Sequence, residues 1–224
     1  MASTEAPTLA GQIQTFQQNM SGRVPPEIGV ALGAETARII HSGVAARSLK
    51  AGGQAPDFAL PDVRGQVVQL VTLLEHGPVV VTFYRGEWCP YCNLTLRAYQ
   101  AALPAITALG ATLGAISPQT PDHSLTSAEK KGLTFPVLSD MGNRVARRYG
   151  LVFALSETAR SIYTAIGSDV PAYNGDASWE LPMPGTFVIA ADGTVRLAFV
   201  DADATQRLEP SAILATLRGL TPSR

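Results

Sequence analysis

The chain is poor in cysteine, in aromatic residues and in charge of either sign. Its 224 residues include two cysteines, 7% aromatic residues and 16% charged residues. A secreted scaffold held by disulfides would need several cysteines spread along the chain, so this class is excluded and a reducing, cytoplasmic location is expected. The 17 basic residues nearly balance 18 acidic ones, which excludes the strongly basic surface that nucleic acid requires.

Long apolar runs are also missing. The most apolar stretch, residues 101–116, contains Pro104, Gly110 and Gly114 and falls short of the roughly 20 residues needed to cross a bilayer. The first residues lack the basic start and apolar run of a secretory signal. Because 46% of the chain is hydrophobic, a disordered protein is excluded too. We therefore expect a globular protein with neither a membrane nor a nucleic-acid partner.

Two helices are expected near the N-terminus, separated at Pro25, with the second running from Pro26 to Arg47. Apolar side chains recur in this second segment at helical spacing. The resulting amphipathic face is expected to dock either on the main domain or on a second copy of the chain. We accordingly assign residues 1–50 to an N-terminal helical extension and residues 51–224 to one domain.

Segments typical of strands and helices alternate after residue 78. The run Val79–Tyr84 has β-branched and aromatic residues without charge, which predicts a central strand buried on both faces. A short hairpin is expected before it, between residues 58 and 70. Further strands are predicted at 112–116, 137–138, 186–189 and 195–199, and helices at 91–109, 121–131, 143–149, 157–166 and 210–217. This alternation predicts one α/β domain whose central strands are at least partly parallel.

The two cysteines form a Cys-x-x-Cys pair, Cys89 and Cys92, between the predicted central strand and the next helix. The first turn of a helix has unpaired N–H groups and the positive end of the helix dipole, both of which favour a thiolate. Arg85 is a candidate partner of that thiolate, with a solvated loop cation as the alternative. A second sulfur can resolve the adduct formed by the first, so a cycling dithiol needs no cofactor.

Two other interpretations of the cysteine pair stay open from the residues alone. The pair could supply half of a zinc site, with His41, His76 or His123 as the remaining ligands. It could also be a buried pair without reactivity, because free cysteine packs well as a small hydrophobe. Redox use is the interpretation that we favour.

The cysteine motif and its surroundings resemble two branches of the thioredoxin-like superfamily. Trp88-Cys89-Pro90-Tyr91-Cys92 is similar to the Trp-Cys-x-x-Cys of thioredoxins and the Cys-Pro-Tyr-Cys of glutaredoxins. The surroundings resemble the peroxiredoxins of the AhpC/TSA family. The residues that carry this second likeness are Ala55-Pro-Asp-Phe58, Phe83-Tyr84, the peroxidatic position at Cys92, Ala115-Ile-Ser117, Phe135-Pro-Val-Leu-Ser-Asp140, Ala146-Arg-Arg-Tyr-Gly150 and Thr186-Phe-Val-Ile189.

The resemblance covers about residues 52–200. It implies a thioredoxin-like, peroxiredoxin-type three-layer α/β domain that follows the N-terminal helical extension. The likeness to thioredoxins implies that Trp88 shields the sulfurs and offers a flat apolar surface to a partner, with simple packing as the alternative. Together with Tyr84 and Pro184, Trp88 makes up the substrate-binding residues that we expect.

Departures from the peroxiredoxin pattern fall on the site itself. The family has a proline, a threonine and a strand arginine where this chain has Arg85, Cys89 and Pro184. The resemblance implies that the threonine and the arginine bind the peroxide, so both contacts must be replaced here. An arginine of the predicted helix 143–149 is one candidate, although a solvated face is expected there. Pro184 instead resembles the cis-proline of thioredoxin-like reductases, with an ordinary proline at the start of a strand as the alternative.

Three functions are compatible with these features. The first is a thiol-dependent peroxidase for hydrogen peroxide or organic hydroperoxides, in which the Cys92 thiolate becomes a sulfenic acid that Cys89 resolves and a thioredoxin or glutathione/glutaredoxin system reduces the disulfide. The second is a disulfide reductase in which Cys89 attacks and Cys92 resolves. The third is a redox sensor that acts without turnover through the N-terminal helices, which are also a candidate homodimer interface.

Overall fold

A five-stranded mixed sheet forms the centre of the computed structural model, which describes residues 7–220 apart from the side chains at 125, 127, 130 and 131. The strand order is β5 (Val137–Ser139), β4 (Thr112–Ser117), β3 (Val79–Phe83), β8 (Gly185–Ile189) and β9 (Val195–Val200). Strands β3, β4 and β5 run parallel, whereas β8 and β9 are antiparallel to their neighbours. The predicted α/β domain with partly parallel central strands is confirmed.

Strand β3 lies in the middle of this sheet because every residue in it tolerates burial. All five residues are buried, and successive side chains point to opposite faces. Val80 packs in the apolar cluster on one face, while Val79, Val81 and Phe83 pack in the cluster on the other. The chain leaves this strand directly into the segment that carries the cysteine pair.

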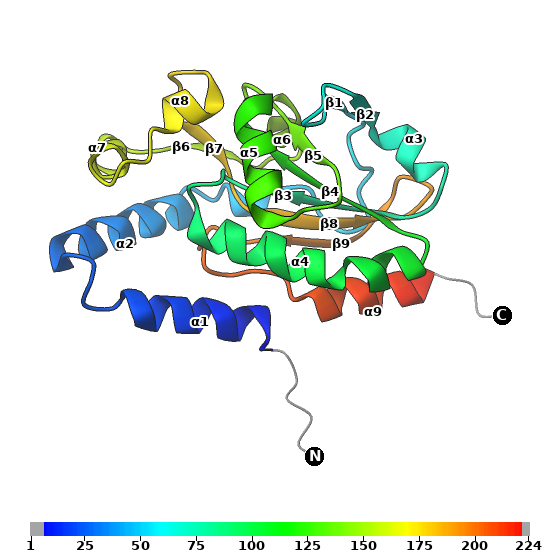
Figure 1. Ribbon diagram of the computed structural model, residues 1–224, viewed down its shortest axis with the longest axis horizontal. Helices are drawn as coiled ribbons and strands as arrows, with labels where there is room; N and C mark the ends of the chain where they lie inside the picture. The colour runs from blue at the N-terminus through cyan, green and yellow to red at the C-terminus, as the bar shows by residue number, and fades with distance from the viewer. Residues whose placement is uncertain (1–6, 221–224) are drawn as a thin grey trace, which may run out of the picture.

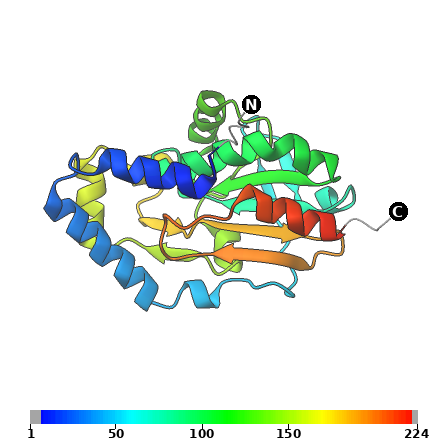
Figure 2. The same cartoon turned by 90° about the horizontal axis from the view of Figure 1, so that it is seen from below.

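Helices and a small hairpin cover the two faces of the sheet (Figure 1). The long helices α4 (Pro90–Ala108) and α9 (Pro210–Leu220) lie side by side on one face, as Figure 2 also shows. Helix α5 (Pro121–Lys131) contacts the edge strand β5 and buries Ala128 in the same cluster as α4 and α9. The other face carries β1 (Ala59–Pro61), β2 (Val67–Gln69), α3 (Leu70–Leu74) and α6 (Arg144–Arg148). The layers are therefore helix, sheet, and a mixed layer of hairpin and helices.

A second, two-stranded sheet lies beside the main one. Strand β6 (Val152–Ala154) pairs with β7 (Glu180–Pro182), and α7 (Glu157–Ala165) and α8 (Val170–Asn174) connect the two. Our sequence analysis missed β6, β7, α3 and α8. Each is three to five residues long, which is too short for a hydrophobic period to show.

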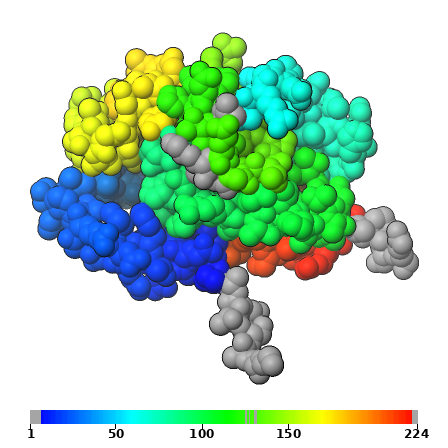
Figure 3. All heavy atoms as spheres, viewed as in Figure 1, coloured from blue at the N-terminus to red at the C-terminus, as the bar shows by residue number. Residues whose placement is uncertain are grey.

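The N-terminal helices dock on the domain, one of the two placements that we expected. Helix α1 (Leu9–Met20) packs on α4, where the rings of Phe16 and Tyr91 meet edge to face at 5.5 Å. Helix α2 (Pro26–His41) runs beside α7, and Figure 3 shows both helices pressed against the body of the molecule. A homodimer interface on these helices stays a prediction.

The second N-terminal helix is shorter than predicted. It ends at His41, and a single 3₁₀ turn, η1 (Ala45–Arg47), follows. Gly43 explains the break because its φ of 67° lies in the left-handed region, which ends a helix. Across residues 7–220, no helix combines the length and the apolar character that crossing a membrane requires.

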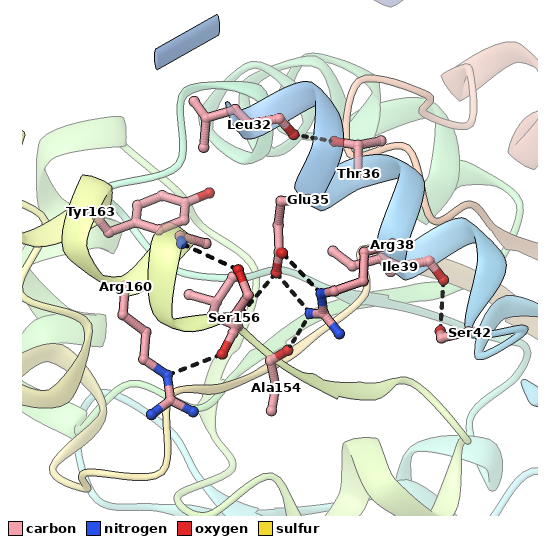
Figure 4. Close-up of polar contacts among 12 residues, drawn as sticks. Leu32, Glu35, Thr36, Arg38, Ile39, Ser42, Ala154, Ser156, Arg160 and Tyr163 are labelled. Carbon is pink, nitrogen blue, oxygen red and sulfur yellow. Dashed lines mark hydrogen bonds and ion pairs between the residues drawn. The ribbon is translucent and has the colours of Figure 1, made fainter. Parts of the chain in front are cut away.

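An ion pair between the buried Glu35 and the half-exposed Arg38 anchors α2 to the start of α7 (Figure 4). The Glu35 carboxylate, which is 8% exposed, lies 2.7 Å from Nη2 of Arg38 and accepts a hydrogen bond from the Ser156 amide at 3.1 Å. Arg38 also donates to the carbonyl of Ala154 at 2.6 Å. The hydrogen bond from Arg38 outweighs burial and lowers the pKa of Glu35 from 4.5 to about 2.

We expect Glu35→Gln to lower the free energy of unfolding at neutral pH by about 1–3 kcal/mol, because the Arg38 cation loses its buried partner. The folded pKa of Glu35 lies below its unfolded value, so its stabilisation is fully present above about pH 4.5 and is lost as the pH falls through about 2. Urea unfolding from pH 7 down to pH 2 measures both effects.

The control is Glu157→Gln, because the Glu157 side chain on α7 is 87% exposed. The variant at position 35 should show a weaker acid dependence than the native chain, and the control should match the native chain. Equal acid dependence in all three proteins would contradict the anchoring role of Glu35.

Candidate active site

The cysteine pair lies at the corner where β3 gives way to α4, as predicted. Cys89 is the N-cap residue of α4, Pro90 occupies the first helical position, and Cys92 lies in the first turn. Proline suits that first position because it has no N–H to leave unpaired. Both cysteines are completely buried and free of disulfide.

The Cys89 sulfur accepts two hydrogen bonds at this corner. Nη2 of Arg85 donates at 3.1 Å, and the backbone amide of Cys92 donates at 3.4 Å, which makes the sulfur the cap of the helix. Arg85 is itself only 8% exposed. Its guanidinium also lies 5.3 Å from the centre of the Trp88 ring and donates to the hydroxyl of Tyr163 at 3.3 Å. The predicted closeness of Arg85 to the pair is confirmed, with Cys89 as its contact.

These contacts shift the pKa values of the two sulfurs in opposite directions. Burial raises the pKa of Cys89, but the hydrogen bond from Cys92 and the charge of Arg85 outweigh it and hold that pKa well below the usual range. Burial, the hydrogen bond to Cys89 and the negative charge on Cys89 all raise the pKa of Cys92. The contacts therefore favour ionisation of Cys89 over Cys92, as the reductase hypothesis requires, whereas the peroxidase hypothesis begins from a Cys92 thiolate.

A second arginine faces the other sulfur. Nη2 of Arg207 lies 3.8 Å from the Cys92 sulfur, on the segment between β9 and α9. Our sequence analysis missed it, because no motif surrounds it and the family resemblance ends before it. The helix 143–149 supplies no replacement: Arg147 pairs with Glu180 at 2.6 Å and Arg148 donates to the Asp57 carbonyl at 2.6 Å.

A chain of buried hydroxyl groups holds the Arg207 segment against the sheet. The Tyr99 hydroxyl on α4 donates to the carbonyl of Leu208 at 3.1 Å and lies 3.0 Å from the Thr186 hydroxyl. Thr186 on β8 in turn lies 3.0 Å from the hydroxyl of Thr82 on β3. Three elements of the core thereby fix the backbone next to Arg207.

Cys92 borders a small cavity of about 10 Å³, room for roughly one water molecule. Tyr84, Pro184, Thr186 and Arg207 are among its lining residues. Tyr84 and Pro184, predicted as substrate-binding residues, thus lie beside the pair. Trp88 is half-buried and stacks edge to face on Tyr163 at 5.1 Å.

The peptide bond before Pro184 is trans, so the geometry implied by the resemblance to the cis-proline of reductases is not adopted. The amide of Met183 donates to the carbonyl of Leu151 at 2.8 Å, and Gly185 pairs with Phe83 across the sheet. The chain is therefore held by strand pairing on both sides of Pro184.

The zinc interpretation finds no ligands around the pair. Among the residues that the structure describes, no three His, Cys, Asp or Glu side chains gather as a metal site. His123, one of the three candidates, stacks on the ring of Tyr173 at 4.7 Å.

A buried thiolate and thiol at the strand-to-helix corner of a layered α/β domain define a thiol oxidoreductase of the thioredoxin-like class. Residues 51–198 match the family model described as the AhpC/TSA family. The chain belongs to this family and is a peroxiredoxin-family oxidoreductase.

Solved structures and curated relatives agree with this assignment. The crystal structure of peroxidoxin BcpB from Mycobacterium tuberculosis superposes with a TM-score of 0.61 at 26% identity, covering 78% of this chain and 99% of that one. The chloroplastic peroxiredoxin Q of Gentiana triflora is 30% identical over 148 residues, which is 66% of this chain and 58% of that protein. Peroxiredoxin Bcp of Escherichia coli K12 is 33% identical over 103 residues, 46% of this chain and 65% of that protein. The peroxiredoxin-type fold is thereby confirmed.

We expect Arg85→Met to raise the pKa of Cys89, because both the cation and its hydrogen bond to the sulfur are lost. The thiolate absorbance in the ultraviolet, followed from pH 4 to pH 10, measures this pKa even though the sulfur is buried. Arg144→Met is the matched control, since Arg144 is exposed on α6. An unchanged titration in the Arg85 variant would show that the helix end alone ionises Cys89.

Proposed function

We propose that this chain is a thiol peroxidase that reduces hydrogen peroxide or organic hydroperoxides and ends each turnover with a Cys89–Cys92 disulfide. The observation that carries the proposal is a thiolate–thiol pair with a guanidinium beside each sulfur, Arg85 at 3.1 Å and Arg207 at 3.8 Å. Two fixed cations stabilise negative charge as it moves between the sulfurs and the peroxide oxygens.

Cys92 is the sulfur that attacks in this proposal, because it holds the peroxidatic position of the family and borders the small cavity. Its proton passes to the Cys89 thiolate, with which it shares a hydrogen bond. The Cys92 sulfur takes the outer oxygen of the peroxide, the O–O bond breaks, and the leaving alkoxide or hydroxide recovers the proton. The Cys89 thiolate then attacks the Cys92 sulfenic acid and expels hydroxide, which leaves the disulfide.

The residues around the pair support this sequence of steps. Arg85 stabilises the thiolate that acts first as proton acceptor and then as resolving nucleophile. Arg207 lies where charge develops on Cys92 and the peroxide oxygens. Tyr84 and Pro184 border the same small cavity as Cys92, and the half-buried Trp88 covers the Arg85 side of the pair.

The disulfide requires an external reductant, for which we propose a thioredoxin or a glutathione/glutaredoxin system. Both sulfurs are fully buried in the reduced state, so the reductant must meet a more open, oxidised conformation. Trp88 lies next to Cys89 in the sequence and keeps part of its ring exposed. That ring is the contact surface that we propose for the reductant.

We expect Cys89→Ser to accumulate a sulfenic acid on Cys92 after one equivalent of hydrogen peroxide. The substitution removes both the resolving sulfur and the negative charge that raises the pKa of Cys92, so Cys92 ionises more readily and its product persists. Dimedone labelling followed by peptide mass spectrometry identifies the modified sulfur.

Cys92→Ser is the paired variant in this experiment. It should consume no peroxide and carry no dimedone on Cys89, whereas the native chain should lose two thiols for each peroxide. Labelling of Cys89 in the Cys92 variant, with Cys92 unmodified in the other, would reverse the assigned roles. Oxidation of the native chain without recycling by any reductant system would favour the redox sensor.

The low pKa of Cys89 favours a second function, disulfide reduction. A thiolate capped by Arg85 and the helix end is poised to attack a disulfide, with Cys92 in the first turn as the resolving thiol. In this case the roles of the sulfurs are opposite to those in peroxide reduction.

The second function predicts that Cys92→Ser traps a mixed disulfide on Cys89 when glutathione disulfide is supplied, because the resolving thiol is absent. The native chain should release glutathione and form its own disulfide instead. Intact-protein mass spectrometry distinguishes the two products. Absence of any glutathione adduct on Cys89, under conditions in which peroxide oxidises the native pair, would exclude disulfide reduction and support the peroxidase function.

A further inference from the structure

A cavity of about 370 Å³ lies between α2 and the domain, next to the cysteine pair, although neither sulfur lines it. Helix α2 forms one wall, the β6–β7 sheet with α7 forms another, and residues 202–205 close a third side. Arg85 and Pro184, which flank the cysteine pair, also line it. The family match begins at residue 51, so the α2 wall belongs to the extension of this chain.

The walls of this cavity combine an apolar patch with polar side chains. Leu32 and Ile39 on α2 face Phe153, Leu155 and Met183 from the domain. The volume is at the lower end of the range of about 300–1,000 Å³ that small-molecule sites span, and roughly 150 Å³ of apolar cavity already holds a benzene ring. An aromatic or short aliphatic group therefore fits with room for a polar end.

The charged residues that line the cavity offer one group that could bind the polar end of a ligand. Arg85 is the one cation among the described residues that line it. Of the two carboxylates, Glu35 is held by Arg38, and Asp203 accepts hydrogen bonds from the amide and hydroxyl of Thr205, both at 2.9 Å. A ligand with an apolar body and one oxygen-rich end is thus directed with that end toward Arg85 and Cys89.

Two exposed glycines on α2 border this space. Gly29 and Gly33 line the cavity one helical turn apart. Each costs a helix interior roughly 0.5–1 kcal/mol relative to alanine. Neither has a positive φ, and a Cβ added at either would meet no atom within 4 Å. Backbone conformation and crowding therefore do not require glycine at these positions.

We propose that α2 is the specificity wall of the peroxidase, with Gly29 and Gly33 holding open the space for the apolar group of an organic hydroperoxide. The hydroperoxide end points toward Arg85 and Pro184, and Pro184 also lines the small cavity that Cys92 borders. The inference rests on the proposed function. The chemistry balances within the site: one O–O bond breaks, the two sulfurs lose two electrons to form the disulfide, and the products are the alcohol and hydroxide.

Gly33→Leu tests the proposal, because a Cβ at this position meets no atom within 4 Å and leucine is the better helix former. We expect the ratio of the oxidation rates with cumene hydroperoxide and hydrogen peroxide to fall about tenfold or more. Single-turnover loss of thiols, measured in stopped flow without reductant, gives this ratio. Val30→Leu is the matched control, since Val30 is 74% exposed on the same helix and should leave the ratio unchanged.

Binding of 2-phenyl-2-propanol, the alcohol product of cumene hydroperoxide, separates this proposal from the proposed function. Calorimetry should show that the native chain and the Val30 control bind it and that the Gly33 variant loses at least about tenfold in affinity. Alcohol binding that Gly33→Leu weakens would uphold the cavity as a ligand site even if no peroxide oxidises the pair. An unchanged rate ratio together with unchanged binding would overturn the proposal, and a defect seen only in recycling would assign the cavity to the thiol reductant.

Discussion

The contact between Arg85 and Cys89 is the interaction on which the rest of the site depends. A guanidinium that is 8% exposed cannot shed its proton, so its burial is tolerable only beside a negative charge. A buried thiol would likewise stay protonated without a cation. The buried guanidinium and the buried thiolate thus stabilise each other's charge. The N-terminal end of α4, which donates a hydrogen bond to the sulfur, stabilises the thiolate further. The loop between β3 and α4 positions both, since it carries Arg85 at one end and Cys89 at the other.

If Cys89 carries the negative charge, Cys92 at the peroxidatic position of the family must lose a proton before it can attack. A protonated Cys92 attacks only if its proton has somewhere to go, and the neighbouring thiolate is the acceptor within hydrogen-bond reach. In the proposed peroxidase, the same sulfur then resolves the sulfenic acid. Replacing the family's threonine by Cys89 therefore exchanges a neutral hydroxyl for a charged, redox-active group. Arg207 supplies a cation near the attacking sulfur, which the missing strand arginine no longer does.

Elements defined by many residues could be predicted from the sequence. Contacts between single side chains that are distant in the sequence could not. The charge-free run at Val79–Tyr84 is long enough to predict a central strand, and the turn residues Asp192 and Gly193 separate the two strands predicted at 186–189 and 195–199, which pair as β8 and β9. Three-residue strands such as β6 leave no period to detect. The ionised sulfur could not be predicted, because it depends on whether a flexible arginine reaches the first or the second cysteine. Arg207 could not be found either, since it lies outside every motif and meets Cys92 only through the fold.

The N-terminal helices link the stability of the chain to access to its site. Glu35 both anchors α2 through Arg38 and Ser156 and lines the cavity that reaches Arg85. At the opposite end of the extension, the carboxylate of Glu209 accepts hydrogen bonds from the amides of Leu9 and Ala10, at 3.1 and 2.8 Å. Glu209 is two residues from Arg207, so α1 is tied to the segment that faces Cys92. Because both helices are attached beside one of the two arginines, loss of their docking would alter the environment of both sulfurs. The extension is therefore better regarded as part of the active site than as an appendage to the family domain.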